Sequence, residues 1–373
     1  LGEGNQAKAD RTAMNGLFLS ALSFLVFAVI GLTCSRLYFT IQTDIQRIVD
    51  YGESYMMICC VCSFGVFFQI TLERTLQATG RTLYTMFTQA TGAIINIILD
   101  PIMIFGLFGF PRMEVAGAAL ATVTGQIVAA IVGLIVNIKC NHDIHIRREN
   151  IRWDPIVAKE IYRVGIPSII MQSISSVMTF GMNKILFVFT PTATAVFGAY
   201  FKIQSFVFMP IFGLNNGMVP IISYNYGARR PDRVKKTIKL AVCYAECIML
   251  IGFCIFQFAP DKVLGIFAAS DAMLAIGIPA MRIICLHFLL AGVSIVLSSV
   301  FQALGNGVFS LIVSVCRQLF VLLPAAWLLA QTGNVNNVWW AFFIAEIVSV
   351  LLSLGFYARI NKNIIAPMYS PAE

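Results

Sequence analysis

Long apolar segments recur along the whole sequence, and they constrain the fold more than any other feature. Runs of about 20 residues, such as NGLFLSALSFLVFAVIGL after Met14, are long enough to cross the hydrocarbon core of a bilayer as a helix. Backbone polar groups have no water partners there, so a helix that satisfies them internally is the expected structure. Hydrophobic residues make up 58% of the chain and charged residues only 12%, which is too little charge for a water-soluble surface. The sequence therefore predicts an all-α, polytopic membrane protein.

We expect ten transmembrane helices, joined mostly by short loops that contain helix breakers, such as TGRT and QTGNVNN. The longest polar interval divides four helices from six. This division predicts an N-terminal lobe at 1–139, a cytoplasmic linker at 140–162, a C-terminal lobe at 163–358 and a cytoplasmic tail at 359–373. The linker is either a solvated segment or, over Ile151–Ile161, an amphipathic helix lying on the membrane surface. The expected spans are 15–37, 53–74, 82–107, 115–139, 163–189, 193–223, 234–258, 274–300, 308–330 and 335–358.

Lys and Arg residues are distributed unevenly between the two sets of loops. Most of the 26 fall on one side, with the linker and both chain ends, whereas the other side holds only Arg36, Arg47, Arg112 and Lys262. Because positively charged loops remain in the cytoplasm, we expect a multi-pass protein of the cell (plasma or inner) membrane with both ends of this chain cytoplasmic. The net charge of +8 then indicates topology and attraction to membrane lipids, not binding to nucleic acid.

A weak internal repeat relates the two halves of the sequence. LGEGNQAKADRT at 1–12 aligns with YGARRPDRVKKT at 226–237, and the same spacing aligns LQATG at 76–80 with FQALG at 301–305. Duplicated halves of this kind are typical of transporters. Two expected helices precede the second copy and have no counterpart before the first copy. The repeat therefore predicts parallel lobes of six helices each, with two further N-terminal helices that precede this sequence.

Five segments resemble the multidrug and toxic compound extrusion (MATE) family: LQATGR, NIILDPIMIFG, VAGAALATVTGQ, FMPIFGLNNGMVPIISYNYGARRPDRVKK and FQALGNG. The resemblance covers essentially the whole chain. It implies two six-helix bundles facing a central cavity. It also implies export of amphipathic, often cationic compounds in exchange for inward H⁺ or Na⁺, with no cofactor besides the coupling ion. The proton-coupled branch has a key acidic residue on a helix that would precede this sequence. The sodium-coupled branch has a glutamate on the first helix of the second half, where this sequence offers Gln172, Ser175 and Ser176.

Polar residues within the expected spans are the candidate substrate- and ion-binding residues, because burying them in a membrane is costly. Gln89, Asn96 and Asp100 share one face of their helix with Thr85, and Pro101 follows to bend it. This stripe either lines a cavity, where Asp100 binds a proton or a cationic substrate, or packs against a neighbouring helix. A second stripe on 163–189 includes Gln172, Ser176 and Asn183. These residues either face a hydrated cavity or serve helix packing and backbone hydrogen bonding.

Three further candidates are ionisable residues at depth. Glu246 and Glu346 lie near the middle of their expected spans, where they either serve transport or form a structural ion pair with one of three cations, Lys202, Arg282 and Arg317. His287 either relays protons or packs as a hydrogen-bonded core residue. We interpret Glu73, at a helix end, as an interfacial residue.

These features favour a secondary active exporter of small organic molecules that works by alternating access, which we expect to be monomeric. The alternative within the same superfamily is a flippase for lipid-linked oligosaccharides or polysaccharides, which the cations inside the second-half helices favour. A membrane-embedded enzyme would need a nucleophile, a metal or an acid–base constellation at plausible spacing, and the sequence shows none. The ten cysteines lie in or beside apolar runs without zinc-ligand spacing, so we expect no metal site.

Overall fold

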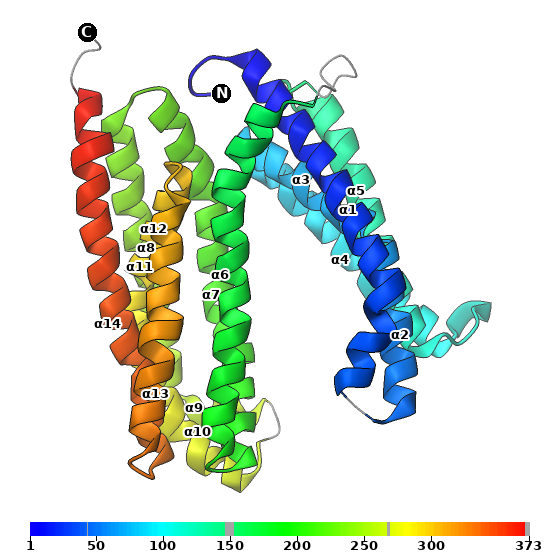
Figure 1. Ribbon diagram of the computed structural model, residues 1–373, viewed down its shortest axis with the longest axis vertical. Helices are drawn as coiled ribbons and strands as arrows, with labels where there is room; N and C mark the ends of the chain where they lie inside the picture. The colour runs from blue at the N-terminus through cyan, green and yellow to red at the C-terminus, as the bar shows by residue number, and fades with distance from the viewer. Residues whose placement is uncertain (43, 146–152, 267–268, 370–373) are drawn as a thin grey trace. The chain divides into compact units, whose positions relative to one another are not determined.

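The computed structural model describes residues 1–42, 44–145, 153–266 and 269–369. Helices and their connections account for all of these residues, and no strand occurs among them, which confirms the all-α class. The chain divides into two compact units (Figure 1). Unit 1 comprises Leu1 and Glu3–Ile161, and unit 2 comprises Gly2 and Tyr162–Glu373. The boundary lies inside one continuous helix.

Unit 1 contains five α-helices and a short 3₁₀ turn, η1. The helix α4 is followed by Gly106, whose φ of 73° is left-handed and suits glycine at low cost, so this residue terminates the helix. The helices α2 and α3 form a pair bent by 47°, because the ladder of helical hydrogen bonds breaks between them. The bounds are α1 Gln6–Gln42, α2 Gln46–Val61, α3 Phe64–Ala78, α4 Thr82–Phe105, η1 Leu107–Gly109 and α5 Glu114–Cys140.

Unit 2 contains spans with internal irregularities. The span between α12 and α13 is continuous but π-helical over Cys316–Leu322, and a 3₁₀ turn joins α10 to α11. The bounds are α6 Pro155–Phe187, α7 Pro191–Gly227, α8 Pro231–Phe258, α9 Pro260–Gly265, α10 Asp271–Ile284, η3 Cys285–His287, α11 Phe288–Ala303, α12 Gly307–Val315, η4 Cys316–Leu322, α13 Leu323–Ala330, α14 Val335–Ile360, η5 Asn361–Ile365 and η6 Ala366–Tyr369.

The helices match the expected membrane spans. Within the described residues, 9 helices are long and apolar enough to cross a membrane, and the bent pair α2–α3 raises the number to 10. Large apolar side chains cover their outer faces, as Leu32, Ile97 and Leu351 show with exposed fractions of 65%, 69% and 65%. Such exposure suits a surface that faces lipid. The alternative of a separate surface helix over Ile151–Ile161 is wrong for the described part, because Pro155 begins the long helix α6; residues 151 and 152 lie outside the described residues.

Polar contacts gather at the two ends of unit 1. At one end, Asp143 accepts hydrogen bonds from Gln6 and Arg81, and the His145 backbone N–H donates to Asp10. At the opposite end, three arginines contact acidic or aromatic side chains. These contacts are Arg36–Glu53, Arg36–Asp50, Arg47–Tyr51 and Arg112–Glu114. The cations that the sequence assigned to different membrane sides therefore lie at different ends of this unit.

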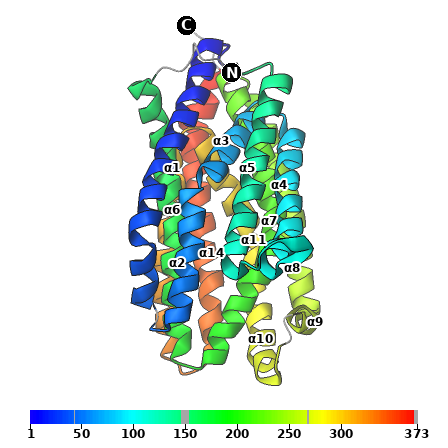
Figure 2. The ribbon, with the colours of Figure 1, turned by 90° about the vertical axis from the view of Figure 1, so that its right-hand side faces the viewer.

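Unit 2 has a large aromatic core and two distinct ends. Trp339, Tyr200, Phe197 and Phe256 are among its largest fully buried side chains. In Figure 2, the α9–α10 region lies at the end opposite the C-terminus. Near the C-terminus, the Tyr369 hydroxyl donates to Asp232 at 2.7 Å, so the tail packs against the cation-rich start of α8.

Candidate transport site

Asp100 lies in a small polar group formed by α2, α4 and α5 of unit 1. It is half-buried on α4, directly before Pro101, which leaves one backbone acceptor of the preceding turn free. The Asn96 side-chain N–H₂ donates to Asp100 Oδ1 at 3.3 Å and to Thr122 Oγ1 on α5 at 3.3 Å. Tyr55 on α2 lies within interaction range of Asp100 and Thr122. The pairing of Asn96 with Asp100 follows from their spacing of one helical turn.

Thr122 and Tyr55 are site residues that the sequence reasoning missed. Neither shares a helix with Asp100, so no spacing along the chain connects them to it. The one available signal was the position of Thr122 in the small-residue run VAGAALATVTG, which allows a close approach of helices. The Asp100 carboxylate and the three neutral side chains of Asn96, Thr122 and Tyr55 form one polar group, which we name the Asp100 site.

Gln89 belongs to a different polar cluster, although it shares the α4 face of Asp100. Its side-chain N–H₂ donates to Glu73 Oε2 at 2.8 Å, and Gln69 donates to Glu73 Oε1 at 2.9 Å. Glu73 is only 4% exposed. Its side chain is enclosed because α1, α4 and α5 pack around α3, whereas the interfacial depth that we expect for Glu73 stays a prediction.

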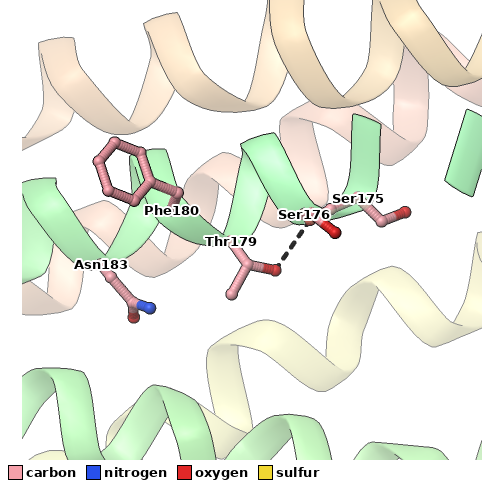
Figure 3. A pocket seen from close by; sticks show the side chains of 5 residues that line it. All are labelled: Ser175, Ser176, Thr179, Phe180 and Asn183. Carbon is pink, nitrogen blue, oxygen red and sulfur yellow. Dashed lines mark hydrogen bonds between the residues drawn. The ribbon is translucent and has the colours of Figure 1, made fainter. Parts of the chain in front are cut away.

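The α6 stripe borders a pocket in unit 2. Ser175, Ser176, Thr179, Phe180 and Asn183 line this pocket, which is wide open and bordered by α6 alone (Figure 3). Thr179 Oγ1 donates to the backbone carbonyl of Ser175 at 2.9 Å, so this hydroxyl serves the helix itself. No described residue hydrogen-bonds to the Asn183 amide, which leaves it available to a ligand. Gln172 is exposed on the same helix but does not line the pocket.

Glu346 is buried in unit 2 and forms an ion pair there. It is 2% exposed on α14, accepts a hydrogen bond from Ser294 on α11 and pairs with Arg317 Nη1 at 3.3 Å. Arg317 stands in the π-helical segment. Of the two readings that the sequence left open, this geometry favours the structural ion pair.

Glu246 and His287 occupy less polar surroundings. The Glu246 Oε1 atom is buried without a hydrogen-bond partner among the described residues, and it lies against Gly292 of α11. His287 is 6% exposed, its Nδ1 lies 2.6 Å from the carbonyl oxygen of Ile284, and its ring packs near Phe208 and Phe342. These contacts favour the packing role of His287.

Apolar spans that carry amides, hydroxyls and carboxylates at depth are typical of membrane transporters. The chain belongs to the MATE family: the MatE family model matches residues 1–102 and 167–328. It is a multi-pass transporter of the multidrug-efflux class, and small organic molecules are the substrates of that class.

Curated relatives support this assignment. Multidrug export protein MepA of Staphylococcus haemolyticus is 25% identical over 373 residues, which are 100% of this chain and 81% of the relative. MepA of Staphylococcus aureus strain NCTC 8325 is 25% identical over 81% of this chain and 66% of its own length.

A solved structure of the MATE multidrug transporter DinF-BH in complex with a dye superposes with a TM-score of 0.87. Its sequence is 28% identical, and the match covers 98% of this chain and 81% of that chain.

Proposed function

We propose that this protein exports amphipathic organic cations by alternating access, in exchange for inward movement of H⁺ or Na⁺. Asp100 is the carboxylate that binds the coupling ion and the substrate cation in turn. Binding of the ion neutralises the carboxylate and weakens its attraction for the substrate, whereas loss of the ion restores it.

The surroundings of Asp100 carry this assignment. Within the described residues, no Lys, Arg or His lies within 4.0 Å of its carboxylate, and the side chain that donates a hydrogen bond to it is the neutral amide of Asn96. A carboxylate without a fixed countercharge can accept a mobile one. Glu346, by contrast, already holds the Arg317 guanidinium.

The α6 pocket supports an amphipathic organic molecule as the substrate. Asn183 offers an amide group, and Phe180 offers an aromatic ring for the apolar part of the substrate, since the Lys184 ammonium already lies 5.5 Å from the centre of this ring. MepA is named a multidrug export protein, and DinF-BH is described in complex with a dye. The amphipathic, cationic dye rhodamine 6G is therefore the first probe to use.

The sidedness follows from the distribution of charge. We assign the end of unit 1 with Asp10 and Asp143, and the end of unit 2 with Asp232 and Tyr369, to the cytoplasm. The cation excess near both ends supports this orientation. Asp100 then lies toward the outer side, on the half of α4 nearest Gly106.

A flippase for anionic lipid-linked substrates is the second candidate, because cations lie inside the second-half helices. The ion pair of Arg317 weakens it, because this guanidinium is already bound to Glu346.

Transport of rhodamine 6G in proteoliposomes with an imposed pH or Na⁺ gradient tests the proposed function. We expect one gradient to drive accumulation of the dye, Asp100→Asn to abolish the response and Asn183→Leu to weaken it, because Asn183 lines the pocket. The matched control is Ser173→Ala, because Ser173 lies on α6 outside the pocket and bonds its own backbone. Gradient-driven transport that is unchanged in both Asp100→Asn and Asn183→Leu would contradict the site assignment.

A further inference from the structure

Glu73 is a buried carboxylate outside the Asp100 site, and both of its oxygens accept hydrogen bonds from neutral side-chain amides. Oε1 accepts from the Gln69 amide at 2.9 Å and Oε2 accepts from the Gln89 amide at 2.8 Å. Thr85 adds a contact of 3.4 Å to the Glu73 backbone carbonyl, which fixes α4 against α3 at this point. Each carboxylate oxygen therefore has one neutral partner.

Charged groups at the end of unit 1 that contains Asp10 and Asp143 have partners other than Glu73. Arg74, next to Glu73 on α3, donates from Nη1 to Gln77 Oε1 at 2.8 Å. Arg81 pairs with Asp143 at 3.3 Å. Asp10 on α1 accepts hydrogen bonds from the Gln6 side-chain amide and from the His145 backbone N–H. The other charged groups of α1, α4 and α5 at this end are Lys8, Arg11 and Lys139, whereas Arg36, Asp100 and Glu114 lie toward the opposite end. Among the described residues, no cation lies within 4.0 Å of the Glu73 carboxylate.

Amide partners suit a carboxyl group that changes its protonation state. An amide presents both N–H donors and a carbonyl acceptor, and rotation of the side chain exchanges them. Ionised Glu73 is satisfied by two N–H donors, as in the structure. Protonated Glu73 would be satisfied by one N–H donor and one amide carbonyl, which accepts from the new carboxyl O–H. Arginine has donors only and stabilises only the ionised form, as at Glu346.

A tight helix crossing separates Glu73 from Asp100. Between Gln89 and Asn96, Gly92 of α4 lies against Gly125 of α5. A Cβ atom on Gly125 would lie 2.6 Å from the Gly92 carbonyl oxygen, and one on Gly92 would lie 3.1 Å from the Gly125 carbonyl oxygen. The two backbones thus touch, with the Gln89–Glu73 contact on one side and the Asn96–Asp100 contact on the other. At about 1.5 Å per residue, Gln89 and Asp100 are roughly 16 Å apart along α4.

We propose that Glu73 is a second proton-binding site of unit 1, placed in series with Asp100 on the other side of the Gly92–Gly125 crossing. The proton binds one carboxylate oxygen, and the amide of Gln69 or Gln89 turns to accept the new O–H. Gln89 is exposed, so its rotation opens the buried carboxyl group to the surroundings at the end of the unit that we assign to the cytoplasm. In transport, Glu73 would be the group from which protons leave. That role depends on the H⁺ coupling proposed above, whereas proton binding at Glu73 does not.

Carbodiimide labelling of the intact protein tests proton binding directly. Dicyclohexylcarbodiimide enters membranes and reacts with protonated carboxyl groups, and mass spectrometry locates the product. We expect labelling of Glu73 that falls by about tenfold or more as the pH rises from about 5 to about 8, and no labelling of the ion-paired Glu346. Gln89→Met removes one amide of similar size and should shift the midpoint of this pH dependence. Absence of label on Glu73 at every pH, or labelling that does not vary with pH, would overturn the proposal.

Transport measurements separate this proposal from the proposed function. If H⁺ drives uptake of rhodamine 6G, the Glu73→Gln variant should still bind the dye. Its transport rate should no longer depend on the pH of the solution on the side of the membrane nearer to Glu73. An unchanged pH profile in Glu73→Gln overturns its role in proton release. If no proton gradient drives transport of the dye, the H⁺ coupling fails, and pH-dependent labelling of Glu73 still establishes the proton site.

Discussion

Arg317 and Glu346 form an ion pair in unit 2, in which Nη1 lies 3.3 Å from Oε2. Asp100 and Asn96 in unit 1 show the opposite arrangement, a carboxylate with a neutral donor at 3.3 Å. The first carboxylate has a permanent countercharge, and the second can exchange a mobile one. This difference decides which acid we assign to transport and which to stability.

Removing the cation of the ion pair should destabilise unit 2. Arg317→Met leaves the Glu346 charge buried with only Ser294 as a hydrogen-bond partner. Loss of one partner of a buried pair costs several kcal/mol, and we expect about 2 kcal/mol because Arg317 is partly exposed. Thermal unfolding of the detergent-solubilised protein measures this change. The double variant Arg317→Met/Glu346→Leu should regain most of the loss, and a single variant as stable as the intact protein would contradict a structural role.

The glycine crossing of α4 and α5 should tolerate no side chain. Gly125→Ala places a methyl group 2.6 Å from the Gly92 carbonyl oxygen, so the helices must separate, at a cost of about 1–3 kcal/mol. The matched control is Gly213→Ala on α7, where no atom lies within 4 Å of the added Cβ. There we expect unchanged or slightly increased stability, because alanine favours a helix over glycine. Equal unfolding temperatures for the two variants would show that the crossing is loose.

Thr122 should position the Asp100 site without changing its charge. Thr122→Val keeps the shape of the side chain and removes the acceptor of the Asn96 amide. Without this acceptor, the Asn96 amide is less fixed in position and orients the Asp100 carboxylate less well. We therefore expect the rate of gradient-driven rhodamine 6G transport to fall by roughly three- to tenfold and its dependence on pH to shift. Transport rates at several pH values test this effect. A reduced rate with an unchanged pH profile would indicate a structural contribution alone.

Asn183 should contribute to substrate affinity at the α6 pocket. Asn183→Leu removes the unoccupied amide at nearly constant size, so we expect the rhodamine 6G concentration for half-maximal transport to rise by roughly fivefold, the equivalent of one hydrogen bond. The maximal rate should change little. Ser173→Ala is again the control on the same helix. A loss of maximal rate with unchanged affinity would contradict a binding role.

The proposed sidedness can be tested with single cysteines in a cysteine-free variant. Lys262→Cys on α9 should react with a membrane-impermeant maleimide applied to intact cells, whereas Lys239→Cys on α8 should react only after the membrane is opened. Both lysines are exposed, so accessibility depends on the side of the membrane and not on burial. The reverse labelling pattern would invert the proposed topology.

Several parts of the structure could be predicted from the sequence. The spans follow from apolar length, because a buried backbone in lipid must satisfy its own hydrogen bonds. The Asn96–Asp100 contact follows from helical periodicity, since both residues lie on one helix one turn apart. Breaks within spans were missed, among them the 47° bend between α2 and α3 and the π-helical segment at Cys316–Leu322. No proline lies at the bend, so the sequence offers no strong signal there.

The partners of the acidic residues were decided only by the tertiary structure. Gln89 and Asp100 share a face of α4, yet Gln89 binds Glu73 on α3. Glu346 could have paired with any of three cations, and packing of α14 against the π-helical segment selects Arg317. Hydropathy and periodicity describe one helix at a time, so the sequence determined the class of protein, its spans and the polar face of each helix. Which carboxylate is neutralised and which stays available depends on a few ångströms between helices, and packing alone sets those distances.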